Sequence, residues 1–147
     1  MEPRSTEQRK ASVLEKLRTE VDIWVASAGA AGEAYLLPLS FYWDGARLTV
    51  ATPKNSRTAR NLRRAGVARM ALGPTRDVVI LEGALEFIPV GADDELAEAH
   101  AKKAGFDARH SQQENVYIRM TPRQIQAWRE VNELAGRDVM KDGRWLA

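Results

Sequence analysis

Apolar and polar residues alternate through much of the chain, and this alternation predicts a β-rich protein. Between Leu36 and Thr52, apolar side chains recur at about every second position on both sides of the dipeptide Asp44-Gly45. Asp-Gly between two apolar runs indicates a hairpin, because a type I′ turn requires positive φ at both central residues. Pro38 lies inside the first arm. It predicts an edge position or a bulge there, because proline cannot donate a hydrogen bond to a central ladder.

Several other stretches show the same kind of pattern. Strands are predicted over residues 22–27, 67–72, 78–90 and 116–120, with an interruption at Pro122 and a resumption over 125–128. Gly83 inside the long third run indicates a bulge or a bend. Helices are predicted over residues 6–20 and 92–104, with a short basic helix between Asn55 and Gly66. Antiparallel strands without regular βαβ alternation favour a mainly β fold, a small barrel with short peripheral helices, over a doubly wound sheet.

The most informative stretch follows the second arm of the hairpin. Pro53 ends the strand, and either Asn55 or Ser56 is suited to cap the following helix, because its side chain can accept a hydrogen bond from a free N–H of the first turn. Helix starts favour anions, and this one also carries Lys54 and Arg57. One interpretation is a phosphate clamp at the edge of the sheet. The other is an ordinary capped surface helix with solvated arginines, and the local residues do not separate the two.

Composition and charge narrow the class of protein. The chain has 147 residues and is expected to form one domain, residues 1–147. Its lack of cysteine excludes disulfides, thiol nucleophiles, zinc–thiolate sites and iron–sulfur sites. The first ten residues are polar, and no apolar run approaches the length of a membrane span. We therefore expect a cytoplasmic protein that does not associate with a membrane. A net charge of +2 argues against a general nucleic-acid binder. Binding of a nucleic-acid phosphate backbone by the basic helix is nevertheless kept as one hypothesis for the function.

Few residues suggest acid–base or metal chemistry. The only histidines are His100, in a predicted helix, and His110, in a predicted loop, and both are expected to be surface residues. No ligand spacing indicates a metal site, so no metal is expected, and no side chain stands out as catalytic. The aromatic side chains either form a wall for a planar ring or pack in the core and a dimer interface. These residues are Phe41, Tyr42, Trp24, Trp43, Trp128 and Trp145.

The order and spacing of these segments resemble a known superfamily. The relevant residues read W-V-A-S-A, then L-L-P-L-S-F-Y-W-D-G-x-x-L-T-V-A-T-P, then S-x-T-x-R-N-L-R-R-x-G-x-A-R-M-A-L-G, then D-V-V-I-L-E-G. Together they are similar to the pyridoxamine 5′-phosphate oxidase-like, FMN-binding split-barrel superfamily. The chain looks most like its flavin/deazaflavin oxidoreductases, which use FMN or coenzyme F-420. The similarity covers about residues 22–87, and the segment from Pro122 to Trp145 looks like the C-terminal part of one subgroup. Residues that would bind pyridoxal phosphate are not matched.

The resemblance implies an antiparallel split β-barrel of Greek-key type that forms a homodimer, with cofactor sites at the subunit interface. It implies that one strand lies along the coenzyme ring and that a second strand contacts the ring through its backbone. It also implies that the start of the basic helix binds the phosphate. The ring strand is represented by Pro38, Leu39 and Ser40, the backbone contacts by Val50, Ala51 and Thr52, and the phosphate wall by Lys54, Ser56, Arg57, Thr58, Asn61 and Leu62.

Two functions from different classes follow from the resemblance. The first is an oxidoreductase that transfers hydride between FMN or coenzyme F-420 and a small conjugated organic substrate. The second is a non-catalytic split barrel that binds or sequesters a flavin, haem or similar ligand. In the first, the coenzyme supplies the hydride chemistry, and the protein supplies binding, orientation and electrostatics.

Overall fold

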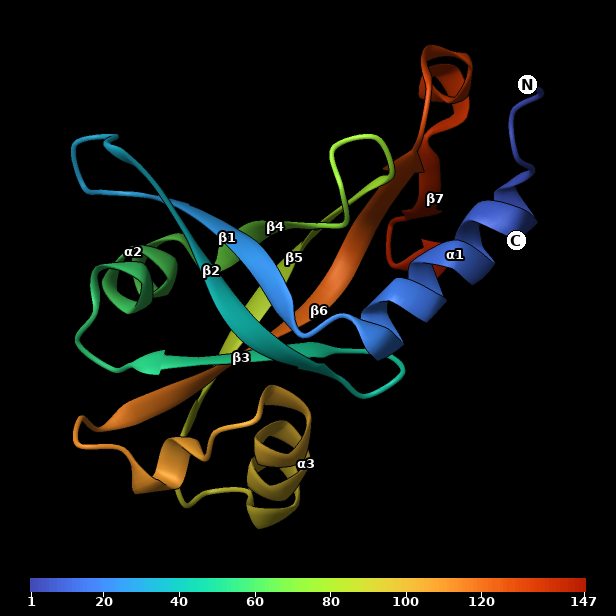
Figure 1. Ribbon diagram of the computed structural model, residues 1–147. Helices are drawn as coiled ribbons and strands as arrows, with labels where there is room; N and C mark the ends of the chain where they lie inside the picture. The colour runs from blue at the N-terminus through green and yellow to red at the C-terminus, as the bar shows by residue number, and fades with distance from the viewer.

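A computed structural model describes residues 1–147 and shows a closed antiparallel β-barrel (Figure 1). The barrel strands pair in the order β3-β2-β1-β4-β5-β6, and β6 returns to pair with β3. Two short strands, β7 and β8, extend the sheet beyond β6. The strands are β1 (Asp22–Ala28), β2 (Ala34–Trp43), β3 (Leu48–Pro53), β4 (Val67–Leu72), β5 (Val78–Pro89), β6 (Asn115–Trp128), β7 (Asp138–Lys141) and β8 (Arg144–Trp145).

Short helices surround the barrel, as the sequence predicts. In Figure 1, α2 lies beside β1, α3 lies below β3, and α1 runs along the C-terminal strands. Their bounds are α1 (Thr6–Thr19), α2 (Arg57–Ala65) and α3 (Asp94–Ala104), with two 3₁₀ turns, η1 (Ala108–His110) and η2 (Val131–Gly136). None of these helices is long and apolar enough to cross a membrane. The prediction of a mainly β barrel with peripheral helices is confirmed.

Two apolar clusters cover the two faces of β3 and β6. The larger cluster fills the barrel and includes Phe41, Val50 and Ile118. The smaller cluster lies outside the barrel, between the barrel strands and α3, and includes Ala51 and Tyr117. Burial on both faces explains why every residue of β3 before its terminal proline is buried. The two clusters therefore fix the end of β3, and with it the start of α2.

Strands β2 and β3 pair over only part of their length. Their ladder runs from Trp43 opposite Leu48 to Phe41 opposite Val50 and stops there. Beyond that point β3 pairs with β6 alone, and β2 pairs with β1 alone. Pro38 lies in this one-sided part of β2, opposite Trp24 of β1. The prediction of an edge position for Pro38 is confirmed, and the end of β3 that leads into α2 is left without β2 as a neighbour.

The predicted hairpin between β2 and β3 is confirmed, but the predicted type I′ turn at Asp44-Gly45 is wrong. The connection has four residues, and only Gly45 has positive φ (100°). The Asp44 carboxylate accepts hydrogen bonds from the backbone N–H groups of Ala46 and Arg47, at 2.8 and 2.6 Å. Those bonds stabilise a wider turn. The dipeptide with positive φ at both residues is Asp142-Gly143, between β7 and β8.

Strand β6 is continuous through Pro122, so the predicted interruption there is wrong. The β5–β6 register shifts between Glu82 and Gly83, and Gly83 pairs with Pro122 at this irregularity. A Cβ atom at Gly83 would lie 2.1 Å from the carbonyl oxygen of Thr121. The strands therefore approach closely enough there to require glycine, and the predicted bulge at Gly83 is confirmed. A bulge tolerates proline because it already lacks a regular ladder bond.

His100 is fully buried, at 0% exposure, so the prediction of a surface histidine is wrong. It lies on the inner side of α3, and its ring meets those of Tyr117 and Phe106 edge-on, with centroids 5.5 and 5.6 Å apart. Both ring nitrogens and the Tyr117 hydroxyl lack hydrogen-bond partners. Burial lowers the pKa of His100, because the charged form would lose its hydration. His110 is exposed, as predicted.

The C-terminal tail docks onto the body of the protein. Trp145 packs against the main core, and the Lys10 ammonium lies 5.1 Å from its ring centroid. Arg4 and Glu133 form an ion pair at 2.9 Å between the N-terminal segment and η2. This hydrogen-bonded arginine lowers the pKa of Glu133 to about 2. The two ends of the chain are thus held together on the side of the barrel away from α2.

We predict that buried His100 makes the protein lose stability as the pH falls. The pKa of His100 is lower in the folded state, so the unfolded chain takes up a proton first below an ordinary histidine pKa of about 6.5. Between about pH 8 and pH 5, the melting temperature of the wild type should therefore fall more steeply than that of His100→Leu. His110→Gln, at the exposed histidine, should keep the wild-type slope. Parallel profiles for wild type and His100→Leu would contradict this assignment.

Candidate anion-binding site at the start of α2

The first turn of α2 follows directly from the end of β3. Pro53 forms the last β3–β6 pair, opposite Asn115, and its carbonyl accepts a hydrogen bond from the N–H of Ser56. The Ser56 hydroxyl oxygen then caps the helix by accepting from the N–H of Ala59 at 3.1 Å. The same oxygen lies 3.1 Å from the hydroxyl of Thr52, within hydrogen-bonding distance. These bonds fix the helix start relative to the barrel, and Ser56 is the predicted N-cap.

This helix start has free hydrogen-bond donors. The N–H groups of Ala59 and Arg60 bond to Ser56, whereas those of Arg57 and Thr58 have no acceptor in the protein. The Thr58 hydroxyl is buried and also lacks a partner. Unpaired N–H groups and the positive end of the helix dipole together favour an anion.

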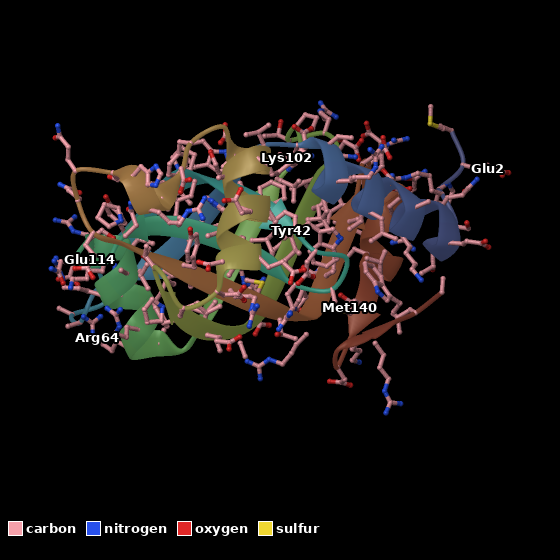
Figure 2. The ribbon with its side chains drawn as sticks, turned by 90° about the horizontal axis from the view of Figure 1, so that it is seen from below. Glu2, Tyr42, Arg64, Lys102, Glu114 and Met140 are labelled. Carbon is pink, nitrogen blue, oxygen red and sulfur yellow. The ribbon has the colours of Figure 1, made fainter.

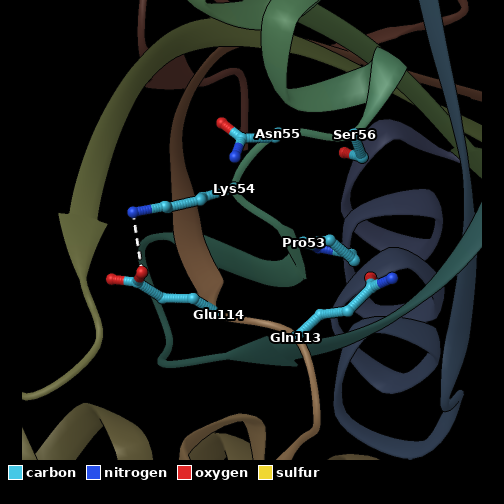
Figure 3. A pocket seen from close by; sticks show the side chains of 6 residues that line it. All are labelled: Pro53, Lys54, Asn55, Ser56, Gln113 and Glu114. Carbon is cyan, nitrogen blue, oxygen red and sulfur yellow. Dashed lines mark ion pairs between the residues drawn. The ribbon is translucent and has the colours of Figure 1, made fainter.

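A cavity of about 430 Å³ lies beside this turn (Figure 3). Its lining residues are Pro53, Lys54, Asn55, Ser56, Gln113 and Glu114. The Lys54 ammonium lies 2.6 Å from a Glu114 carboxylate oxygen, and Figure 3 shows the lysine extended toward Glu114 and away from Ser56. Lys54 also donates its backbone N–H to the carbonyl of Glu114 at 2.9 Å. The cavity therefore contains a cation that a carboxylate already holds.

A second cavity, of about 280 Å³, lies on the other side of α2, against the turn between β1 and β2. Arg57, Arg60 and Arg64 line it from the helix. The Arg57 guanidinium carbon lies 4.9 Å from the ring centroid of Tyr35, and Arg60 donates to the carbonyl of Asn55 at 2.6 Å. None of these three arginines has an acidic partner within 4.0 Å. The start of α2 is thus flanked by two polar cavities that share no lining residue.

The predicted ring residues lie in the one-sided part of β2. Pro38 is exposed, Leu39 packs against the core, and Ser40 donates to the Asp22 carboxylate at 2.8 Å. Pro38 shares the outer face of the barrel with Trp24, which is its cross-strand neighbour. Of the three residues, Pro38 is the one that presents its side chain at the surface beyond the end of the β2–β3 ladder.

The residues predicted to give backbone contacts are less accessible. Val50 is in the barrel core and pairs with β2 on one side and β6 on the other. The side chain of Ala51 is buried under α3, and that of Thr52 is buried beside Ser56. Ala51 and Thr52 pair with β6 only, so their backbone lacks a ladder partner toward β2.

The remaining predicted residues are divided between the site and the core. Lys54, Ser56 and Arg57 lie at the helix start and line one of the two cavities. Asn61 lines the second cavity, although it also donates to the Ser27 hydroxyl at 3.1 Å. Leu62 is a core residue, and Thr58 is buried behind the first turn. The aromatic residues do not form one wall.

Several residues that line the cavities are not indicated by the sequence, among them Glu114 and Tyr35. Glu114 lies in a segment that reads only as a polar loop, and Tyr35 is the second residue of β2, in a stretch without a distinguishing pattern. The signal that brings Glu114 to Lys54 is the β3–β6 register, in which Pro53 pairs with Asn115. This pairing joins strands that are far apart in sequence, so no local pattern could have indicated it.

Comparisons with known proteins agree with the barrel topology. A family model described as "Pyridoxamine 5′-phosphate oxidase" matches residues 10–129. Similar solved structures include an F420 reductase, with TM-score 0.64 and 14% identity over 76% of this chain and 93% of that one. A pyridoxamine 5′-phosphate oxidase-related, FMN-binding protein from Nostoc punctiforme has TM-score 0.54 and 14% identity, covering 83% and 78%. HupZ from Group A Streptococcus has TM-score 0.61 and 20% identity, covering 81% and 94%. A comparison with curated proteins gives no match.

We predict that the hydroxyl of Ser56 stabilises the protein as the N-cap of α2, and two substitutions test this role. Ser56→Ala removes the acceptor of the Ala59 N–H and should lower the free energy of unfolding by about 1 kcal/mol. Ser56→Asp keeps a good cap and should retain most of the stability. Chemical denaturation of the three proteins checks this. Equal losses for both variants would show that the hydroxyl does not act as a cap.

Proposed function

The chain belongs to the pyridoxamine 5′-phosphate oxidase family, and we propose that it binds a phosphorylated flavin-type coenzyme, FMN or coenzyme F-420, as an oxidoreductase. The observation that carries the proposal is the start of α2, where two N–H groups lack acceptors next to Lys54 and Arg57. A phosphate has the charge and the acceptor oxygens that such a group of donors can satisfy.

The phosphate would lie against the first turn of α2. The N–H groups of Arg57 and Thr58 would donate to its oxygens, and Ser56 would stay engaged as the cap. The cations on either side, Lys54 in one cavity and Arg57 in the other, would offset its charge. The buried hydroxyl of Thr58 and the core side chain of Leu62 shape this turn from behind.

The ring system would lie along the part of β2 that lacks β3 as a neighbour. Pro38 offers an apolar surface without an N–H group, and beyond Val50 the strand β3 has no ladder partner on the side toward β2. A flavin or deazaflavin supplies hydride transfer when bound. The protein's part is then to hold the phosphate at α2 and to orient the ring along β2, facing a small conjugated substrate.

The charge around the second cavity favours coenzyme F-420 as a candidate. Arg57, Arg60 and Arg64 have no acidic partners, and a coenzyme that carries carboxylates beyond its phosphate would use them. FMN, which ends at its phosphate, would leave Arg60 and Arg64 solvated.

A homodimer is part of the proposal, because large apolar side chains are exposed on β2, β1 and β4. Trp24, Leu36 and Val67 are 49%, 58% and 40% exposed on these adjacent strands. Exposed apolar side chains that gather on neighbouring strands are typical of a protein interface. Pro38 lies on the same face, opposite Trp24, so a second copy seated there would cover the proposed ring position. The coenzyme sites would then lie between the subunits.

The small number of acid–base side chains in the cavities favours a second candidate function, binding without turnover. Glu114 and Glu33 are the only carboxylates that line the two cavities, and neither histidine lines them. A non-catalytic protein that binds a flavin, haem or similar ligand needs no such group. We name no catalytic residue for the oxidoreductase, since hydride transfer by the coenzyme needs orientation first.

We predict that a charge on the apolar face prevents dimerisation. Trp24→Glu places a carboxylate at the centre of the proposed interface, where burial would be costly. Light scattering should give a dimeric mass for the wild type and a monomeric mass for this variant. Val131→Glu, at an exposed apolar residue of η2, should remain dimeric. A monomeric wild type would contradict the proposed assembly.

We predict that the purified protein binds FMN or coenzyme F-420, as measured by fluorescence titration. Lys54→Ala and Arg57→Ala should each weaken binding about tenfold or more, because hydrogen bonds to charged groups are lost. Arg18→Ala, at an exposed arginine of α1, should bind normally. No binding of either coenzyme would exclude the proposal. Turnover of reduced coenzyme with enones and quinones then separates an oxidoreductase from a protein that only binds.

A further inference from the structure

We propose that Glu114 attenuates anion binding by holding Lys54 away from the anion site until a strongly charged phosphate displaces the carboxylate. The proposal rests on the proposed function, because the anion is taken to be the coenzyme phosphate. It concerns a carboxylate that competes with that phosphate for the same ammonium group. The contact that carries it is the 2.6 Å ion pair between Lys54 and Glu114.

The backbone holds Glu114 in place. Its carbonyl accepts the N–H of Lys54 at 2.9 Å, immediately beyond the Pro53–Asn115 pair that ends the β3–β6 ladder. The next residue, Asn115, is buried, and its side chain donates to the carbonyl of Ala108 at 3.0 Å. Glu114 is therefore fixed opposite Lys54 by the fold of both flanking segments.

The direction of the Lys54 side chain shows that its ammonium group contacts either Glu114 or an anion at the helix start. In Figure 3 the lysine extends to Glu114, on the side of the cavity away from Ser56. Glu114 is the only carboxylate that lines this cavity. For the ammonium to contact an anion at the first turn of α2, it must leave Glu114, whose charge then faces the bound anion without a partner.

The exposure of the pair makes this exchange reversible. The two side chains are 45% and 67% exposed, and ion pairs in such positions contribute little net stability. A phosphate monoester, with a charge of about −1.5 to −2 near neutral pH, is able to compete with the single carboxylate. A singly charged or neutral ligand gains less from Lys54 and meets the same glutamate. The pair thus lowers the affinity of the site for anions in general, and a phosphate group offsets this cost better than a singly charged group does.

Four proteins and two probes test the proposal: wild type, Glu114→Gln, Lys54→Ala and the double variant, each titrated with FMN and with coenzyme F-420. Glu86→Gln is the matched control, because it removes one carboxylate from another exposed ion pair, with Arg119 at 2.8 Å. Riboflavin and inorganic phosphate are added as competitors. Thermal melts confirm that each variant is folded.

We expect Glu114→Gln to bind the coenzyme about twofold to fivefold more tightly, the range over which one exposed ion pair changes an equilibrium. The gain should disappear in the Lys54→Ala background, and Glu86→Gln should bind like the wild type. Inorganic phosphate should compete at least as well against Glu114→Gln as against the wild type, because it gains the same contact with Lys54, and riboflavin should compete weakly against both. Glu114→Gln binding that is unchanged or weaker would overturn the competition, while weaker binding by Lys54→Ala would leave the proposed function standing. Equal binding by wild type and Lys54→Ala would instead remove Lys54 from the proposed site. If neither coenzyme binds any of the four proteins, both proposals are overturned.

Discussion

The early end of the β2–β3 ladder is the feature on which the rest of the site depends. Beyond Phe41 and Val50 the two strands separate, and β3 continues with β6 alone. Pro38 fits this arrangement because it has no N–H to leave unpaired on the open side. The separation lets β3 pass into α2 at the surface, where the first-turn donors remain free. A full β2–β3 ladder would occupy the backbone that the proposed ring position uses.

Packing on both faces makes this open end rigid. Val50 points into the barrel and Ala51 points under α3, so β3 cannot shift by one residue without exchanging its two faces. Because α3 covers the outer face of β3, it also buries His100, whose ring nitrogens have no hydrogen-bond partner. At the other end of the molecule, Lys10 of α1 lies over the Trp145 ring and Arg4 pairs with Glu133 of η2. Figure 2 shows Glu2 at this end, far from Glu114 and Arg64. The anion site and the chain termini are thus at opposite ends.

Much of the fold could be predicted from local patterns because its turns and caps use distinctive residues. Gly83 at the bulge, Pro38 at the edge and Ser56 at the cap each have a conformational requirement that few residues meet. Two of the errors arose where tertiary contacts decide: His100 is polar but α3 buries it, and Pro122 continues a strand because a glycine bulge faces it. The sequence predicts the part of the candidate site that the start of α2 forms. The Lys54–Glu114 pair and the core position of Val50 depend on the β3–β6 register, which no local segment encodes.

The most direct measurement is the backbone amide NMR spectrum of the ¹⁵N-labelled protein during titration with FMN, coenzyme F-420 and riboflavin. In the proposed site, a coenzyme phosphate accepts hydrogen bonds from the unpaired N–H groups of Arg57 and Thr58. Either phosphorylated coenzyme should therefore shift these two amide signals downfield, because each N–H gains a charged acceptor, and riboflavin should leave them near their starting positions. Binding of a coenzyme with no change at Arg57 and Thr58, or an equal change with riboflavin, would contradict the account.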